Sequence, residues 1–67
     1  MQTDAVVPLS RREREVALLA GQGLSSKDIA AQLFLSVRTV DNHLQRAYAK
    51  LGVTNRSELG AVLDRTP

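Results

Sequence analysis

The chain has 67 residues, a formal net charge of +2 and no cysteine, which excludes disulfide bridges and thiolate metal sites. One histidine leaves too few ligands for a zinc site, and one phenylalanine and one tyrosine are too few rings to stack single-stranded nucleic acid. So small a domain must be held together by closely packed helices, and we expect neither a metal nor another cofactor.

No apolar stretch reaches the roughly 18 residues that a membrane-spanning helix requires, and no charged-then-apolar leader begins the chain. These observations favour a soluble, cytoplasmic protein with no membrane partner. Residues 1–8 show no clear period and end at Pro8, so we interpret them as a flexible tail or the remnant of a linker. Residues 9–65 form one predicted domain.

The first predicted helix begins at Ser10 and ends at the glycine-containing segment 21–23. Ser10 and Glu13 have the spacing of a capping box, in which the hydroxyl and the carboxylate each accept a backbone N–H. The apolar stripe of this helix consists of Val16, Leu19 and Ala20. We interpret the charged residues of its first turns as a solvated, salt-bridged face; they are Arg11, Arg12, Glu13, Arg14 and Glu15.

The second predicted helix begins at Ser25 or Ser26, and a sharp turn at residues 34–36 follows it. A serine at either position can cap the helix, and Asp28 is favourably placed in the first turn because the helix dipole is positive there. The residues spaced to face inward are Ile29, Ala30 and Leu33.

The third predicted helix covers residues 37–51, between a capping Ser36 and the left-handed exit residue Gly52. Its inward stripe has the spacing of one helical face and consists of Val40, Leu44, Ala47 and Leu51. At roughly 100° per residue, the opposite face carries Arg38, Asn42, Gln45 and Ala49. A helix that buries one stripe and offers hydrogen-bonding side chains on the other can lie in a DNA major groove.

A short fourth helix is predicted over about 56–63, with Asn55 and Glu58 as a second capping box. Its apolar stripe either packs on the core of the same chain or forms a two-fold interface with a second copy; it consists of Leu59, Val62 and Leu63. No alternating run indicates a strand. The predicted fold class is therefore all-α, a compact four-helix domain that contains a helix-turn-helix.

Together these features closely resemble the LuxR/FixJ-type helix-turn-helix domain of bacterial transcription regulators. The matching residues are Leu9-Ser10-Arg11-Arg12-Glu13-Arg14-Glu15-Val16, Gly23-Leu24-Ser25, Lys27-Asp28-Ile29-Ala30, Leu33, Ser36, Thr39-Val40, His43-Leu44, Lys50-Leu51-Gly52-Val53 and Arg56. The resemblance implies binding of double-stranded DNA, with helix 37–51 in the major groove and the preceding helix crossing above it. It also implies a homodimer contact through the fourth helix and, in most members, an upstream sensory domain.

The outward residues of helix 37–51 are the candidates for reading bases. Asn42 and Gln45 can bond the edge of adenine, and Arg38 can reach a base or a phosphate. Asp41 stands where the family commonly has lysine, and Gln45 where it often has a basic residue. Because phosphates repel a carboxylate, Asp41 must avoid the backbone, pair with a neighbouring cation or accept a hydrogen bond from a cytosine amino group.

Positive charge concentrates between residues 36 and 56, which favours a polyanionic partner. Candidate phosphate contacts, which set the register without reading sequence, are Lys27, Ser36, Thr39, Arg46, Lys50 and Arg56. Two helices as short as the fourth bury less than a standard interface, so we expect a homodimer that needs DNA or an upstream domain to become stable.

Other functions stay open at this point. A promoter-binding domain similar to that of a sigma factor also uses a helix-turn-helix, although residues 50–53 and Arg56 favour the LuxR-type family. A helical protein-interaction module with weak or lost DNA affinity is the alternative from a different class, and Asp41 is the feature that favours it. An enzyme is the least supported function, because no nucleophile sits beside a base and no glycine loop cradles a phosphate. We also expect no small-molecule ligand in this domain.

Overall fold

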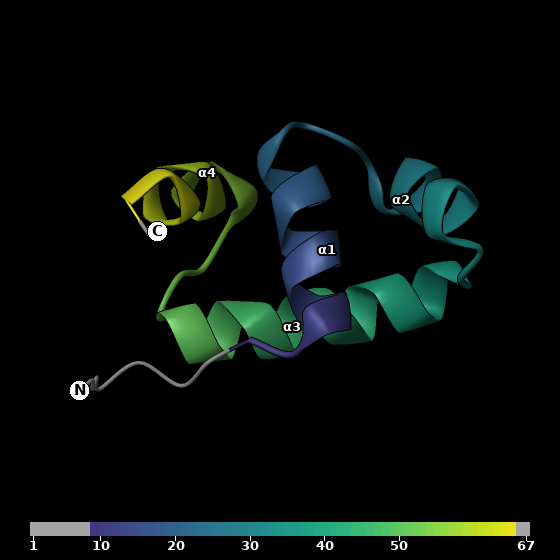
Figure 1. Cartoon of the computed structure of the whole chain (residues 1–67), viewed down its shortest axis with the longest axis horizontal. Coiled ribbons are helices and arrows are strands. Elements are labelled where there is room, and N and C mark those ends of the chain that lie inside the picture. Colours follow the sequence, from purple (N-terminus) through teal and green to yellow (C-terminus); the bar gives the residue numbers. More distant parts are fainter. Residues whose placement is uncertain (1–8, 66–67) are drawn as a thin grey trace.

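Four α-helices make up the computed structural model, which describes residues 9–65. They are α1 (Arg11–Gly21), α2 (Ser26–Leu33), α3 (Val37–Leu51) and α4 (Arg56–Arg65). Figure 1 shows α2, α1 and α4 lying along one side of α3, the longest helix, and α1 contacts all three of the others. No strand occurs within the described residues, so the predicted all-α fold with a helix-turn-helix is confirmed. The predicted tail, residues 1–8, lies outside them.

The start of α1 contains the predicted capping box. The Ser10 hydroxyl accepts the backbone N–H of Glu13 at 3.2 Å, and the Glu13 carboxylate accepts the backbone N–H of Ser10 at 3.0 Å. The two bonds satisfy amides that the first helical turn otherwise leaves without partners. The buried face of α1 is wider than predicted, since Glu13 and Ala17 join Val16 and Ala20 on it.

Helix α2 is capped by Ser25, whose hydroxyl accepts the backbone N–H of Asp28 at 3.1 Å. The helix ends at Leu33, and the next residue, Phe34, caps it in a left-handed conformation with φ 60° although it is not glycine. Phe34 is 93% exposed, so packing does not hold it in this conformation. The sharp turn between α2 and α3 therefore rests on a strained residue, at a cost of about 1 kcal/mol.

Helix α3 begins and ends as the sequence predicts. The Ser36 hydroxyl caps it by accepting the backbone N–H of Thr39 at 3.0 Å, and Gly52 ends it with φ 72°. The predicted inward stripe is buried at Val40, Leu44 and Ala47 and partly buried at its last member. Because this stripe is continuous, α3 turns a single face to the rest of the domain.

At the start of α4, only half of the predicted second capping box forms. Asn55 caps the helix, with its side-chain oxygen accepting the backbone N–H of Glu58 at 3.0 Å. The Glu58 carboxylate, however, binds the backbone N–H and the hydroxyl of Thr54, at 2.7 and 3.2 Å, and not Asn55. The neighbouring residue offers two donors to the carboxylate, so only one arm of the predicted box forms. The helix runs to Arg65, two residues beyond its predicted end.

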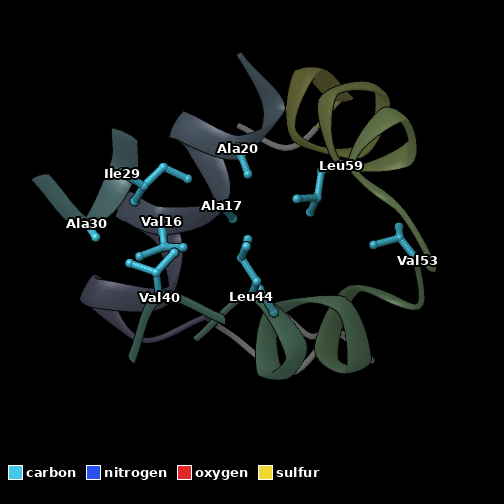
Figure 2. Close-up of a cluster of buried hydrophobic side chains, with 10 residues drawn as sticks. Val16, Ala17, Ala20, Ile29, Ala30, Val40, Leu44, Val53 and Leu59 are labelled. Carbon is cyan, nitrogen blue, oxygen red and sulfur yellow. The ribbon is translucent and has the colours of Figure 1, made fainter. Parts of the chain in front are cut away.

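The core lies where α1, α3 and α4 meet and extends to α2. Its buried residues are Val16, Ala17, Ala20, Ile29, Ala30, Val40, Leu44, Ala47, Val53 and Leu59. Figure 2 shows Leu59 and Val53, on the α4 side, pointing into the space above Leu44. Full burial of each large aliphatic side chain contributes about 1.5–3 kcal/mol, so these contacts hold α3 in place against the other helices.

Candidate nucleic-acid interface

The outward face of α3 is open to solvent. Arg38, Asn42 and Gln45 are all exposed on it, and so are Asp41 and Arg46 on its flanks. The buried stripe of α3 packs into the core and the residues opposite it are exposed, so within residues 9–65 no other helix covers this face. The four residues predicted to read bases are therefore all accessible, three on the outward face and Asp41 on its flank.

The amino end of α3 carries two linked hydroxyl groups. The Ser36 hydroxyl donates to the Thr39 hydroxyl at 2.8 Å while it accepts the backbone N–H of Thr39. Ser36 is exposed and Thr39 is half-buried beside it. Lys27, in the first turn of α2, is exposed as well. These three predicted phosphate contacts are accessible, as is Arg46 farther along α3.

Asp41, the acidic residue of the α3 surface, has a partner on α2. Its Oδ1 atom accepts the hydroxyl proton of Ser26 at 2.7 Å. The guanidinium of Arg56 donates to the same Ser26 oxygen at 2.8 Å and also to the backbone carbonyl of Leu24. A chain of hydrogen bonds thus joins α4, the start of α2 and the recognition face of α3. Asp41 reaches its neighbouring cation through a hydroxyl and not by direct pairing.

Lys50, predicted to contact phosphate, forms an ion pair inside the protein. Its ammonium lies 2.7 Å from the Glu13 carboxylate, whose side chain is 5% exposed. The hydrogen bond from Lys50, with a second from the backbone of Ser10, lowers the pKa of the Glu13 carboxyl from 4.5 to about 2. The interpretation of Glu13 as part of a solvated face was therefore wrong. Only Arg12 and Glu15 of that group pair with each other, at 3.0 Å.

The sequence held a signal for the burial of Glu13 but none for the Asp41 chain. Glu13 precedes Val16, Ala17 and Ala20 by three, four and seven residues, which is the spacing of one helical face. Ser26 and Asp41, in contrast, are 15 residues apart, and Arg56 is 30 residues from Ser26. Local sequence patterns do not predict contacts between residues so far apart.

The predicted dimer residues do not share one surface. Leu59 is fully buried in the core of its own chain, so its assignment to a dimer interface is corrected. Val62 and Leu63 are half-buried and pack at the edge of the same core. A shallow groove lies next to them, and the residues that line it are Leu51, Gly52, Val53, Glu58, Ala61 and Val62.

The described part of the chain contains neither a metal-binding cluster nor a membrane-spanning helix. No group of three or more histidine, cysteine, aspartate or glutamate side chains is arranged to hold a metal ion there. None of the helices over residues 9–65 has the length and apolar character needed to cross a membrane.

A short helix, a sharp turn and a second helix with an uncovered polar face define a helix-turn-helix domain. The model of the luxR family of bacterial regulatory proteins matches residues 7–63. The chain belongs to this family, which confirms the resemblance derived from the sequence.

Three similar proteins illustrate the relationship. The chain is 53% identical over 51 residues to a putative HTH-type transcriptional regulator of Mycobacterium tuberculosis, covering 76% of this chain and 6% of that protein. It is 50% identical over 50 residues to the spore germination protein GerE of Bacillus subtilis, covering 75% and 68%. The crystal structure of ChrA, a response regulator of a heme-sensing two-component system, has a TM-score of 0.81 and 40% identity, covering 92% of this chain and 31% of ChrA. The chain thus spans only a small part of two of these three proteins.

Proposed function

We propose that this chain is a sequence-specific, double-stranded DNA-binding module of a bacterial transcription regulator, with α3 in the major groove. The observation that carries the proposal is the outward face of α3, which is polar, exposed and uncovered by the other described helices. The major groove admits an α-helix, and every base pair presents a distinct pattern of donors and acceptors there. Membership of the luxR family supports the same function.

Base reading falls to the exposed polar side chains of this face. The amides of Asn42 and Gln45 each offer a donor and an acceptor, which match the edge of adenine, and Arg38 matches guanine. Asp41 is the fourth member of the set. A well-aligned bidentate contact contributes about 1–3 kcal/mol of discrimination against a wrong base.

We assign phosphate binding to residues at the amino ends of α2 and α3 and on the flank of α3. The exposed or half-exposed members are Lys27, Ser36, Thr39 and Arg46. We propose that Lys50 and Arg56 act mainly by holding the fold, because Glu13 and the Leu24 carbonyl bind their charged groups. Their remaining positive charge adds to the general attraction for DNA.

A homodimer on DNA is the form in which we propose that the module acts. The groove beside Ala61 and Val62 supplies the apolar surface, and a two-fold axis there sets two recognition helices on one face of the duplex. Their half-sites are then about 34–36 Å apart. This surface is small, so the dimer depends on DNA or on an upstream domain. A protein that binds bacterial chromosomal DNA works in the cytoplasm, and we propose no chemistry of its own for it.

The protein-interaction alternative loses its main support. It depended on Asp41 as an unbalanced negative charge on the recognition face. Ser26 binds that carboxylate, and Arg56 lies next in the same chain of hydrogen bonds. The charge is therefore partly balanced within the domain.

A salt titration of binding to duplex DNA, followed by fluorescence anisotropy, tests the proposed function. The two cationic phosphate contacts of each chain, Lys27 and Arg46, predict that log affinity falls with log salt concentration with a slope of roughly −2 per bound chain. Arg46→Ala should make the slope shallower by about 1. Absence of binding at low salt, or binding that does not depend on salt, contradicts the proposed function.

A further inference from the structure

We infer that Asp41, held by Ser26, selects cytosine at one position of each DNA half-site. The inference rests on the proposed function, because it names one base that the recognition face reads. It starts from the chain of hydrogen bonds that joins Arg56, Ser26 and Asp41, with distances of 2.8 and 2.7 Å.

The direction of every bond in this chain is determined by chemistry. A guanidinium only donates, so Arg56 must donate to the Ser26 oxygen. The serine hydroxyl has a single proton, and it goes to Asp41 because an ionised carboxylate only accepts. With Asp41 at this position, Ser26 therefore turns its donor toward α3.

The contact leaves one carboxylate oxygen of Asp41 for a ligand. Oδ1 is bound by Ser26, and Oδ2 has no hydrogen-bond partner among the described residues. Asp41 is exposed on the flank of α3, one residue before Asn42, which lies on the face proposed to meet the bases. The Ser26 bond restricts the rotation of the side chain, so the outer oxygen is presented in a fixed direction.

A fixed carboxylate oxygen favours a base that offers a proton in the major groove. Only cytosine, through its N4 amino group, and adenine, through N6, do so. Adenine also presents its N7 acceptor beside the amino group, and that acceptor repels a carboxylate. Cytosine is therefore the preferred base at this position.

An isosteric variant tests this inference without changing the shape of the side chain. In Asp41→Asn, we expect the amide oxygen to accept the Ser26 proton as Oδ1 does in the wild type, which turns the NH2 group outward. The outward group then changes from an acceptor to a donor. The preferred base should change from cytosine to one with a major-groove acceptor, guanine or thymine.

The experiment is a selection from a random duplex library with four forms of the intact 67-residue chain. The wild type should enrich a motif with cytosine at one position of each half-site, and Asp41→Asn should enrich the same motif with that position alone changed. Ser26→Ala should flatten the preference at that position only, because the carboxylate loses its orientation. Asp28→Asn is the matched control, since it removes an exposed carboxylate from the first turn of α2 and leaves α3 unchanged. It should raise affinity for every duplex and leave the motif as it was.

Anisotropy on duplexes that differ at this one base pair then gives the size of the effect. We expect the wild type to prefer cytosine over guanine by roughly fivefold to tenfold, and Asp41→Asn to reverse the order. Identical motifs for the wild type and Asp41→Asn, with affinity raised equally on all duplexes, overturn the inference and leave Asp41 a purely structural residue. A wild-type chain that enriches no motif contradicts the proposed function itself, so the two failures are distinguishable. Circular dichroism of each variant confirms that it is folded.

Discussion

The ammonium of Lys50 lies 2.7 Å from the carboxylate of Glu13, which is almost completely buried beneath it. The same carboxylate closes the capping box of α1 through Ser10. One acidic side chain thus connects the first turn of α1 to the last turn of the recognition helix. The orientation of α3 against the domain depends on this contact as well as on the apolar core.

Acid should weaken the fold through Glu13. Its pKa is about 2 in the folded protein and 4.5 without these contacts, so folding favours the ionised form. The resulting stabilisation is complete above about pH 4.5 and is lost as the pH falls toward 2. Urea unfolding between pH 5.5 and 2.5, in steps of about half a unit, should give a falling free energy of unfolding.

Glu13→Gln serves as the control for this acid effect. The amide keeps the shape of the side chain but does not titrate, so the variant should be less stable near neutral pH and should lose less stability in acid. Equal losses for the variant and the wild type over this range would assign the acid sensitivity to other groups.

The turn between α2 and α3 should become more stable when its strained residue is relieved. Phe34 has a positive φ and an exposed ring, so Phe34→Gly removes steric strain and very little packing. We expect a gain of about 0.5–1 kcal/mol in the free energy of unfolding. Gly52→Ala, at φ 72°, should lose a similar amount. Chemical denaturation of both variants checks this, and a destabilised Phe34→Gly would mean that the exposed ring has a stabilising contact.

Leu59 should behave as a core residue and not as an interface residue. Leu59→Ala is expected to lower the free energy of unfolding by about 2–5 kcal/mol, which unfolds much of so small a domain. Leu18→Ala, at a position that is 40% exposed, should change it by only about 0.5 kcal/mol. Denaturation monitored at several protein concentrations separates the two roles. If the loss of unfolding free energy in Leu59→Ala disappeared at low protein concentration, Leu59 would instead act in a dimer interface.

The features predicted correctly from the sequence are those that depend on neighbours three or four residues away. The caps by Ser10 and Ser36 and the buried stripe of α3 are of this kind. Leu59 was ambiguous because helical spacing identifies a buried face but does not say which chain covers it. The ion pair of Glu13 with Lys50 joins residues 37 apart, and only the tertiary fold brings them together.

In the candidate site, too, the local features could be predicted from the sequence and the contacts between helices could not. The outward face of α3 follows directly from its inward stripe, so Asn42 and Gln45 could be assigned to the exposed surface from the sequence. The partner of Asp41 could not, because Ser26 comes from another helix. Even the capping pair of Asn55 and Glu58 was only half right, since a hydroxyl and an amide next to the pair compete for the carboxylate.

The most direct test of the proposed base reading compares Asn42→Ala with Arg46→Ala on the selected site and on random duplex DNA of equal length. Loss of the Asn42 amide should weaken binding to the selected site by about 1–3 kcal/mol and leave binding to random DNA nearly unchanged. Loss of the Arg46 charge should weaken both by similar factors. Equal losses from Asn42→Ala on the two duplexes would contradict a recognition helix that reads sequence through this face.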